Sequence, residues 1–207
     1  ALGIGTSFEF ASGTLQGSGV VEMQGPMTMS GGTLQGGLGL NVRSSLVWTG
    51  GTMQGTGVTQ IGTNGVLTLG GTADKGLHRV LDNGGRAVWS GGRLIFYDGV
   101  VNNQVGAVWE IQCDQPFYDG TFNNFGTVVK VGGTGTTAFV NYYRSAAPLH
   151  NRGVVEVQSG TLQLNGTDTH TGSFVVATNA TLHLANGTHT FEVGSAVSGE
   201  GRLLLSA

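Results

Sequence analysis

A glycine-rich cassette recurs along this 207-residue chain at a nearly regular spacing. Its first three copies read "SGTLQGSGVV", "SGGTLQGGLGLNV" and "TGGTMQGTGVTQI". One bulky apolar residue precedes the Gly-containing turn of each repeat at a nearly constant phase: Phe10, Met29, Trp48, Leu69 and Trp89. A repeat of roughly 20 residues indicates stacked structural units, because each unit alone is too short to bury its apolar face.

The segments between the glycines alternate apolar and polar residues, as in "GVVEVQSGTLQLNG" at 153–166. Period-two alternation over four to six residues is typical of short, half-buried strands. We therefore expect an all-β parallel β-helix (β-solenoid) of about ten rungs of roughly 20 residues, formed by residues 1–207 as a single module of a longer repeat protein. Turn signals at this spacing also suit an antiparallel β-sandwich, but a sandwich does not require one column of equivalent residues.

Two further columns follow from the same alignment. Asparagine recurs at a similar spacing, with one longer step at the end: Asn83, Asn103, Asn124 and Asn151. Aligning "VWEI", "VVKV" and "VVEV" predicts an outward column of alternating charge made of Glu110, Lys130 and Glu156, beside an inward column of Trp109, Val129 and Val155.

Composition excludes several classes of protein. Glycine supplies 39 residues, charged residues only 10%, and the formal net charge is −3. Without a basic cluster the chain has no means of binding the phosphate backbone, so we expect no nucleic-acid partner. It contains no run of about 18 apolar residues, so we expect no membrane insertion. The single Cys113 excludes a disulfide framework within the chain and is expected to be a buried apolar side chain.

The elements N-x-G-x-V-x-V, S-G-T-L-x-L, G-x-F-x-V and G-x-G-x-L between residues 122 and 207, with "WTGG", "WSGG" and "GTLQG" before them, resemble a known repeat family. They are similar to the glycine-rich β-helical repeats of large bacterial secreted and surface proteins, which include adhesin-like and autotransporter-passenger-like proteins. The resemblance implies a β-helical fold and an extracellular or cell-surface location. It brings no set of catalytic residues with it.

The doubled "YDG" motif is the sharpest candidate for chemistry: Tyr97-Asp98 and Tyr118-Asp119. Stacked one rung apart, near 5 Å, the two aspartates could act on a sugar as a carboxylate pair, with the tyrosines stacking on its ring. The alternative is a repeated Asp-Gly turn with no ligand. The insertion "TTAFVNYYRSAAPLH" at 136–150 adds the aromatic and basic side chains of Tyr142, Tyr143 and Arg144 to the same candidate carbohydrate-binding set.

The motif "THT" occurs twice, and its alignment places His170 and His189 outward in neighbouring rungs. Two imidazoles hold a metal only weakly, and no third ligand lies in phase. The sequence therefore predicts no metal and no cofactor.

These observations favour a structural or adhesive extracellular module without catalytic activity: a stiff spacer, a stalk or a filament subunit. Its expected partners are neighbouring modules of the same protein or identical copies stacked end to end, with surface polysaccharide as a further possibility. The alternative function is a carbohydrate-binding or carbohydrate-cleaving β-helix that uses Asp98, Asp119 and the aromatic residues near them.

Overall fold

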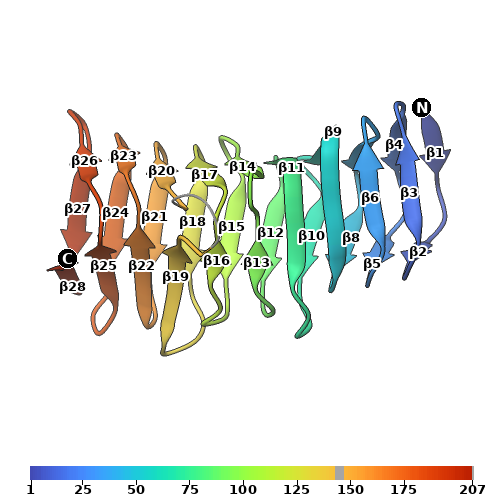
Figure 1. Cartoon of the computed structure of the whole chain (residues 1–207). Helices are drawn as coiled ribbons and strands as arrows, with labels where there is room; N and C mark the ends of the chain where they lie inside the picture. Colours follow the sequence, from blue (N-terminus) through green and yellow to red (C-terminus); the bar gives the residue numbers. More distant parts are fainter. Residues whose placement is uncertain (143–146, 207) are drawn as a thin grey trace.

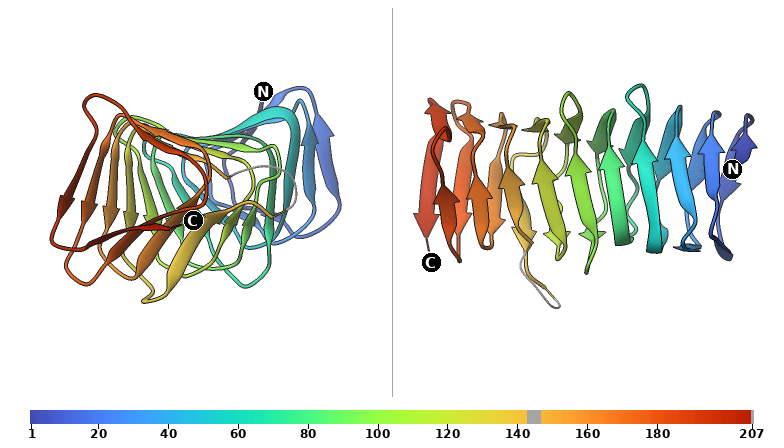
Figure 2. Two further views of the ribbon diagram at one scale, coloured as in Figure 1. Left: turned by 60° about the vertical axis from the view of Figure 1, so that its left-hand side comes forward. Right: turned by 90° about the horizontal axis from the view of Figure 1, so that it is seen from above.

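The computed structural model describes residues 1–142 and 147–206, and in this part of the chain all regular structure is β. The chain winds as a coil of short strands, and each strand pairs with its equivalent in the next rung (Figure 1). The coil has about ten turns, or rungs. The rungs stack along one axis from the N-terminal end to the C-terminal end (Figure 2). The fold is the predicted parallel β-solenoid.

Every strand pair with a defined register is parallel, so the antiparallel sandwich is excluded. The 16-stranded sheet covers two sides of the solenoid, the 10-stranded sheet covers a third, and a small 2-stranded sheet lies near the C-terminal end.

The 16-stranded sheet contains β1 (Leu2–Ile4), β3 (Thr14–Gly17), β4 (Val20–Met23), β6 (Thr33–Gly36), β7 (Gly39–Val42), β9 (Gly51–Ile61), β11 (Lys75–Asn83), β13 (Leu94–Ile95), β14 (Val100–Asn103), β16 (Phe117–Tyr118), β17 (Thr121–Asn124), β19 (Thr136–Val140), β20 (Leu149–Asn151), β22 (Thr161–Asn165), β25 (Thr181–Ala185) and β28 (Arg202–Ser206). The 10-stranded sheet contains β2 (Phe8–Phe10), β5 (Met27–Met29), β8 (Ser45–Trp48), β10 (Val66–Leu69), β12 (Arg86–Trp89), β15 (Val108–Ile111), β18 (Thr127–Lys130), β21 (Val154–Val157), β24 (Ser173–Val176) and β27 (Ala196–Gly199). The 2-stranded sheet contains β23 (Asp168–His170) and β26 (His189–Phe191).

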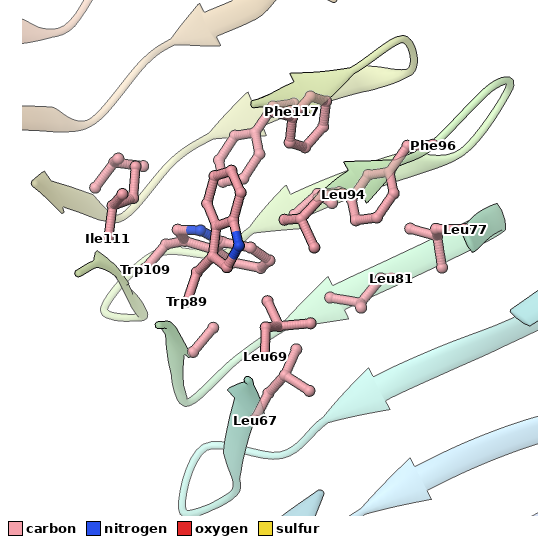
Figure 3. Close-up of a cluster of buried hydrophobic side chains, with 14 of the residues drawn as sticks. Leu67, Leu69, Leu77, Leu81, Trp89, Leu94, Phe96, Trp109, Ile111 and Phe117 are labelled. Carbon is pink, nitrogen blue, oxygen red and sulfur yellow. The ribbon is translucent and has the colours of Figure 1, made fainter. Parts of the chain in front are cut away.

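The predicted apolar column is confirmed. The register pairs its five members successively, from Phe10 with Met29 to Leu69 with Trp89. Both Trp48 and Trp89 are fully buried. Each also donates its indole N–H to a corner carbonyl, Gly50 O at 3.0 Å and Gly92 O at 2.9 Å. Figure 3 shows side chains of successive rungs pointing into one continuous interior.

The asparagine column is confirmed too, and it lies inside the solenoid. All four side chains are fully buried. The Nδ2 atom of each of the first three donates to Oδ1 of the asparagine in the next rung at 2.8–2.9 Å. A buried amide is costly unless it is hydrogen-bonded, and this ladder satisfies each amide with its neighbours.

The charge column was predicted one residue out of register. Glu110 pairs with Val129, which pairs with Glu156, while Lys130 pairs inward with Ile111 and Val157. The reason is a difference in corner length: four residues, 104–107, separate β14 from β15, whereas two residues, 125–126, separate β17 from β18. The predicted alignment matched the three segments by their apolar pattern, with a step of 20 residues from Glu110 to Lys130, whereas the shorter corner makes the true step 19, from Glu110 to Val129.

Candidate functional site

The two "YDG" motifs do not occupy equivalent positions. Leu94 pairs with Phe117 and Ile95 with Tyr118, so Tyr97 is not the rung neighbour of Tyr118. Again the corners differ, with four residues, 96–99, after β13 and two, 119–120, after β16.

The two aspartates lie in different environments. Asp98 is exposed, whereas Asp119 is fully buried and accepts a hydrogen bond from the backbone N–H of Tyr142 at 3.0 Å. Asp119 also has a positive φ of 54°, a conformation that aspartate tolerates better than most residues. The expectation of two stacked, solvent-facing carboxylates is therefore wrong, and Asp119 shapes the corner before β17.

The aromatic members form two separate contacts on the outer surface. The ring of Tyr97 lies 4.4 Å from the ring of His78, and the ring of Tyr118 lies 4.7 Å from that of the exposed Tyr142. The guanidinium carbon of Arg93 lies 6.0 Å from the centroid of the Tyr118 ring. Tyr118, Tyr142 and Arg93 together form a platform on the outer surface, the Tyr118 platform. Aromatic rings arranged in this way can stack on a sugar ring.

The remaining members of the candidate set, Tyr143 and Arg144, lie outside the described residues. Asp74 completes the described part of the platform, because its carboxylate binds Arg93 through two hydrogen bonds of 2.8 and 2.5 Å. This ion pair holds the guanidinium beside Tyr118, and Arg93 lowers the pKa of Asp74 by hydrogen bonding to its charged form.

Among the described residues, three cations lie inside the solenoid, and the sequence pattern did not indicate them. The Lys75 ammonium donates to Ala73 O and Gly91 O, each at 3.0 Å. Lys130 donates to Gly132 O at 2.8 Å and to Asp114 Oδ1 at 2.9 Å. Arg79 donates to the carbonyls of two preceding rungs, among them Leu38 O at 2.9 Å. These cations satisfy backbone carbonyls at corners, so their role is structural.

Cys113 is partly buried and packs against the core. Burial is the main cause that raises the pKa of its thiol, which keeps the sulfur protonated and unreactive. The prediction of a buried apolar side chain holds in part, because Cys113 packs against the core but stays partly exposed.

Asp168, His170 and His189 converge near the C-terminal end. Strands β23 and β26 pair Asp168 with His189 and His170 with Phe191. His170 is fully buried, Asp168 is 1% exposed, and the side chain of His189 is 10% exposed. The prediction that the two histidines stack outward in one column is therefore wrong.

Hydrogen bonds to the chain before them position two of the three. Asp168 Oδ1 accepts from Leu149 N at 3.0 Å, and His170 Nδ1 accepts from Asn151 N at 3.3 Å. Strand β20 forms no backbone ladder with β23. The side chains of Asp168 and His170 instead accept hydrogen bonds from its backbone N–H groups. The second carboxylate oxygen, Asp168 Oδ2, lies 3.1 Å from His189 Nδ1.

Burial governs the charge of the cluster. It raises the pKa of Asp168 to about 7, and the hydrogen bond from the Leu149 N–H lowers this pKa by less than burial raises it. Burial, and then the nearby His189 and His150, lower the pKa of His170 to about 4. Burial also lowers the pKa of His189, with the Ala185 carbonyl opposing it. Both rings are thus neutral at pH 7 and have a lone pair to offer a metal ion.

One sequence signal could have found this cluster. Aligning the two "THT" motifs sets His170 against His189, whereas the sheet sets Asp168 against His189. An alignment that sets Asp168 against His189 places this carboxylate beside His170 and His189.

Within residues 1–142 and 147–206 the structure has no long apolar helix of the kind that crosses a membrane. Comparisons of the chain with protein-family models, with curated proteins and with solved structures give no match.

Proposed function

We propose that this chain is a structural module of an extracellular or cell-surface protein, serving as a stiff spacer, stalk or filament subunit without catalytic activity. The observation that supports this most is the continuity of the 10-stranded sheet, in which every strand from β2 to β27 pairs with its neighbour in the next rung. Repeats that contact only their neighbours form quasi-one-dimensional structures whose length scales with repeat number. Continuous hydrogen bonding along the axis makes such a structure resist extension.

Deleting one rung tests the spacer role. Ser45 pairs with Val66, so residues 45–65 form one complete turn whose removal preserves the register of the rest. We expect this deletion to leave a folded chain whose ends are closer by about 4.8 Å, the spacing between strands, measured between spin labels in the first and last rungs. The control deletion, 45–54, removes half a turn and should unfold the adjoining rungs. Equal damage by both deletions would contradict a modular spacer.

The location needs its own test. An antibody against the chain should label intact cells of the source organism as strongly as permeabilised ones. Labelling only after permeabilisation would overturn the extracellular or cell-surface assignment and leave the spacer role standing.

Apolar side chains near the final rung support stacking on a neighbouring module or an identical copy. Val193 is fully exposed, Leu205 is 68% exposed and Leu203 is 44% exposed. A strand edge with open hydrogen-bonding groups is a template for pairing with another chain. If copies stack, sedimentation should show concentration-dependent assembly that the double variant Leu203→Lys, Leu205→Lys abolishes. A monomer at all concentrations would leave neighbouring modules as the partner.

The platform of Tyr118, Tyr142 and Arg93 favours polysaccharide binding as a second function. We expect saturable retention on a surface polysaccharide that Tyr142→Ala weakens, while Phe8→Ala, at a half-buried aromatic residue far along the chain, leaves it unchanged. Retention that is insensitive to Tyr142→Ala would remove this candidate.

A further inference from the structure

Two buried nitrogen atoms in the C-terminal cluster have no hydrogen-bond partner among the described residues: Nε2 of His170 and Nε2 of His189. Buried polar atoms are nearly always satisfied by protein, water or a bound ion. The Ala185 carbonyl lies close to His189 but makes no hydrogen bond of good geometry with its Nε2. Elsewhere in this solenoid, the buried amides and cations described above are all paired. Of the two, the unpaired Nε2 of His170 calls for a ligand.

We propose that Asp168, His170 and His189 bind one divalent transition-metal ion, with Zn²⁺ as the ion that best fits the donor set. Each residue offers one ligand atom, and these atoms lie within 4.8 Å of one another. Two imidazoles and one carboxylate are a common protein ligand set for zinc, which leaves a fourth tetrahedral position for water. The site is separate from the spacer role and from the Tyr118 platform.

The geometry is close to what zinc needs. With zinc–ligand bonds of about 2.0–2.2 Å, neighbouring ligand atoms in a tetrahedron lie about 3.3–3.6 Å apart. Asp168 Oδ2 and His189 Nδ1, at 3.1 Å, already have nearly this separation. His189 therefore binds through Nδ1 and keeps its ring proton on Nε2. Asp168 Oδ1 stays with the Leu149 N–H, and this second contact orients the carboxylate.

His170 must change most on binding. Its Nδ1 accepts from Asn151 N, so the proton of the neutral ring lies on Nε2. A metal at Nε2 requires the tautomer with the proton on Nδ1. That nitrogen then no longer accepts from Asn151 N, a contact that at 3.3 Å is the longest hydrogen bond in the cluster. Phe174 and Phe191, whose rings lie 4.9 and 5.0 Å from the imidazole, limit the ring to small movements.

Charge favours a cation here. An ionised carboxylate is costly in a buried setting, and a bound divalent ion offsets that cost. His150 faces the same strand, and its Nδ1 is occupied by the Thr169 N–H at 3.1 Å. An ion has a route in, because His189 lines a surface hollow together with Leu184, Thr188 and Leu205.

The test uses the full chain after treatment with a chelator. Titration with Co²⁺ should give the visible absorption of a tetrahedral site, saturating at one ion per chain and displaced by Zn²⁺. Calorimetry with Zn²⁺ should give the same stoichiometry, and His189→Gln should weaken its affinity at least about tenfold, because even loss of a group that only supports a ligand costs about 10- to 100-fold. His183→Gln is the matched control, because His183 lies in β25 and is bonded to Ser206 Oγ outside the cluster.

The wild-type titrations decide the matter even if a cluster variant fails to fold. No saturable one-to-one binding of either ion would overturn the proposal. Equal affinities of folded His189→Gln and His183→Gln for Zn²⁺ would overturn it too, because binding would then be elsewhere. Circular dichroism establishes that each variant is folded.

Discussion

The Asn103 side-chain amide donates to Oδ1 of Asn124, one rung further on, at 2.8 Å. The same amide donates to Thr127 O at 3.0 Å, while its own oxygen accepts from Asn83. Asn103 therefore connects its own rung to both neighbouring rungs.

Replacing Asn103 with alanine should destabilise the solenoid substantially. The change leaves Asn124 Oδ1 and Thr127 O buried without this donor, and each such loss costs about 1–3 kcal/mol. We expect a loss of about 2–4 kcal/mol in the free energy of unfolding, measured by urea denaturation. The neighbouring outward residue is the control: Asn102→Ala should cost less than about 1 kcal/mol. Similar costs for both would show that the buried ladder adds nothing.

Replacing Lys130 with methionine tests the corrected register. The change removes the donor that Gly132 O and Asp114 use, and we expect a cost of about 1–3 kcal/mol in thermal or urea unfolding. Arg86→Met is the control, because Arg86 forms an ion pair with Glu110 from a side chain that is 51% exposed. Exposed pairs contribute about 0–1 kcal/mol. If Lys130 pointed outward, the two variants would be equally mild.

Replacing Gly55 with alanine should separate backbone strain from rung stacking. A Cβ atom at Gly55 would lie 2.4 Å from Gly36 O, and φ there is +92°. Gly106 has a similar φ of +82° but nothing within 4 Å of the added atom. Gly106→Ala should lower the free energy of unfolding by about 1–2 kcal/mol, the penalty for a left-handed residue. Gly55→Ala should lower it by about 1–3 kcal/mol more, because the added atom displaces the neighbouring strand. Equal costs in denaturation would mean that neighbouring rungs yield freely at this corner.

The buried cluster should give the metal-free protein opposing pH dependences. The folded-state pKa of Asp168, about 7, is above its ordinary value of 3.8, so its contribution to stability is full below pH 4 and is lost as pH rises to 7. The folded-state pKa of His170, about 4, is below 6.5, so its contribution is lost as pH falls from 6.5 to 4. Asp168→Asn removes the first effect, so its stability should rise from pH 4 to 6.5 more steeply than that of the wild type. Urea midpoints across this range measure the difference, and parallel profiles would contradict it.

Where each rung carries a recognisable marker residue, the sequence predicts the solenoid well. The columns through Trp48 and Trp89 and through the asparagines were correct because a Gly-containing turn or a repeated asparagine marks the position in each rung directly. The steps nevertheless vary, with 21 residues from Trp48 to Leu69 and 20 from Leu69 to Trp89. The inward position of Lys130 and the separation of Tyr97 from Tyr118 were missed, because four-residue corners replace two-residue ones there. The Asp168 cluster was missed for a related reason. The sheet pairs residues 21 positions apart, Asp168 with His189, whereas the two "THT" motifs are 19 positions apart.

The four-residue corner at 104–107 leaves the strands on both sides of it, β14 and β15, paired with their neighbours in the same way as the other rungs. Length variation is thus absorbed at the vertices and is not transmitted to the interior. Such a vertex is a natural point for grafting a foreign epitope or a binding loop, and several grafts on successive turns would display copies in a line at intervals of one strand spacing.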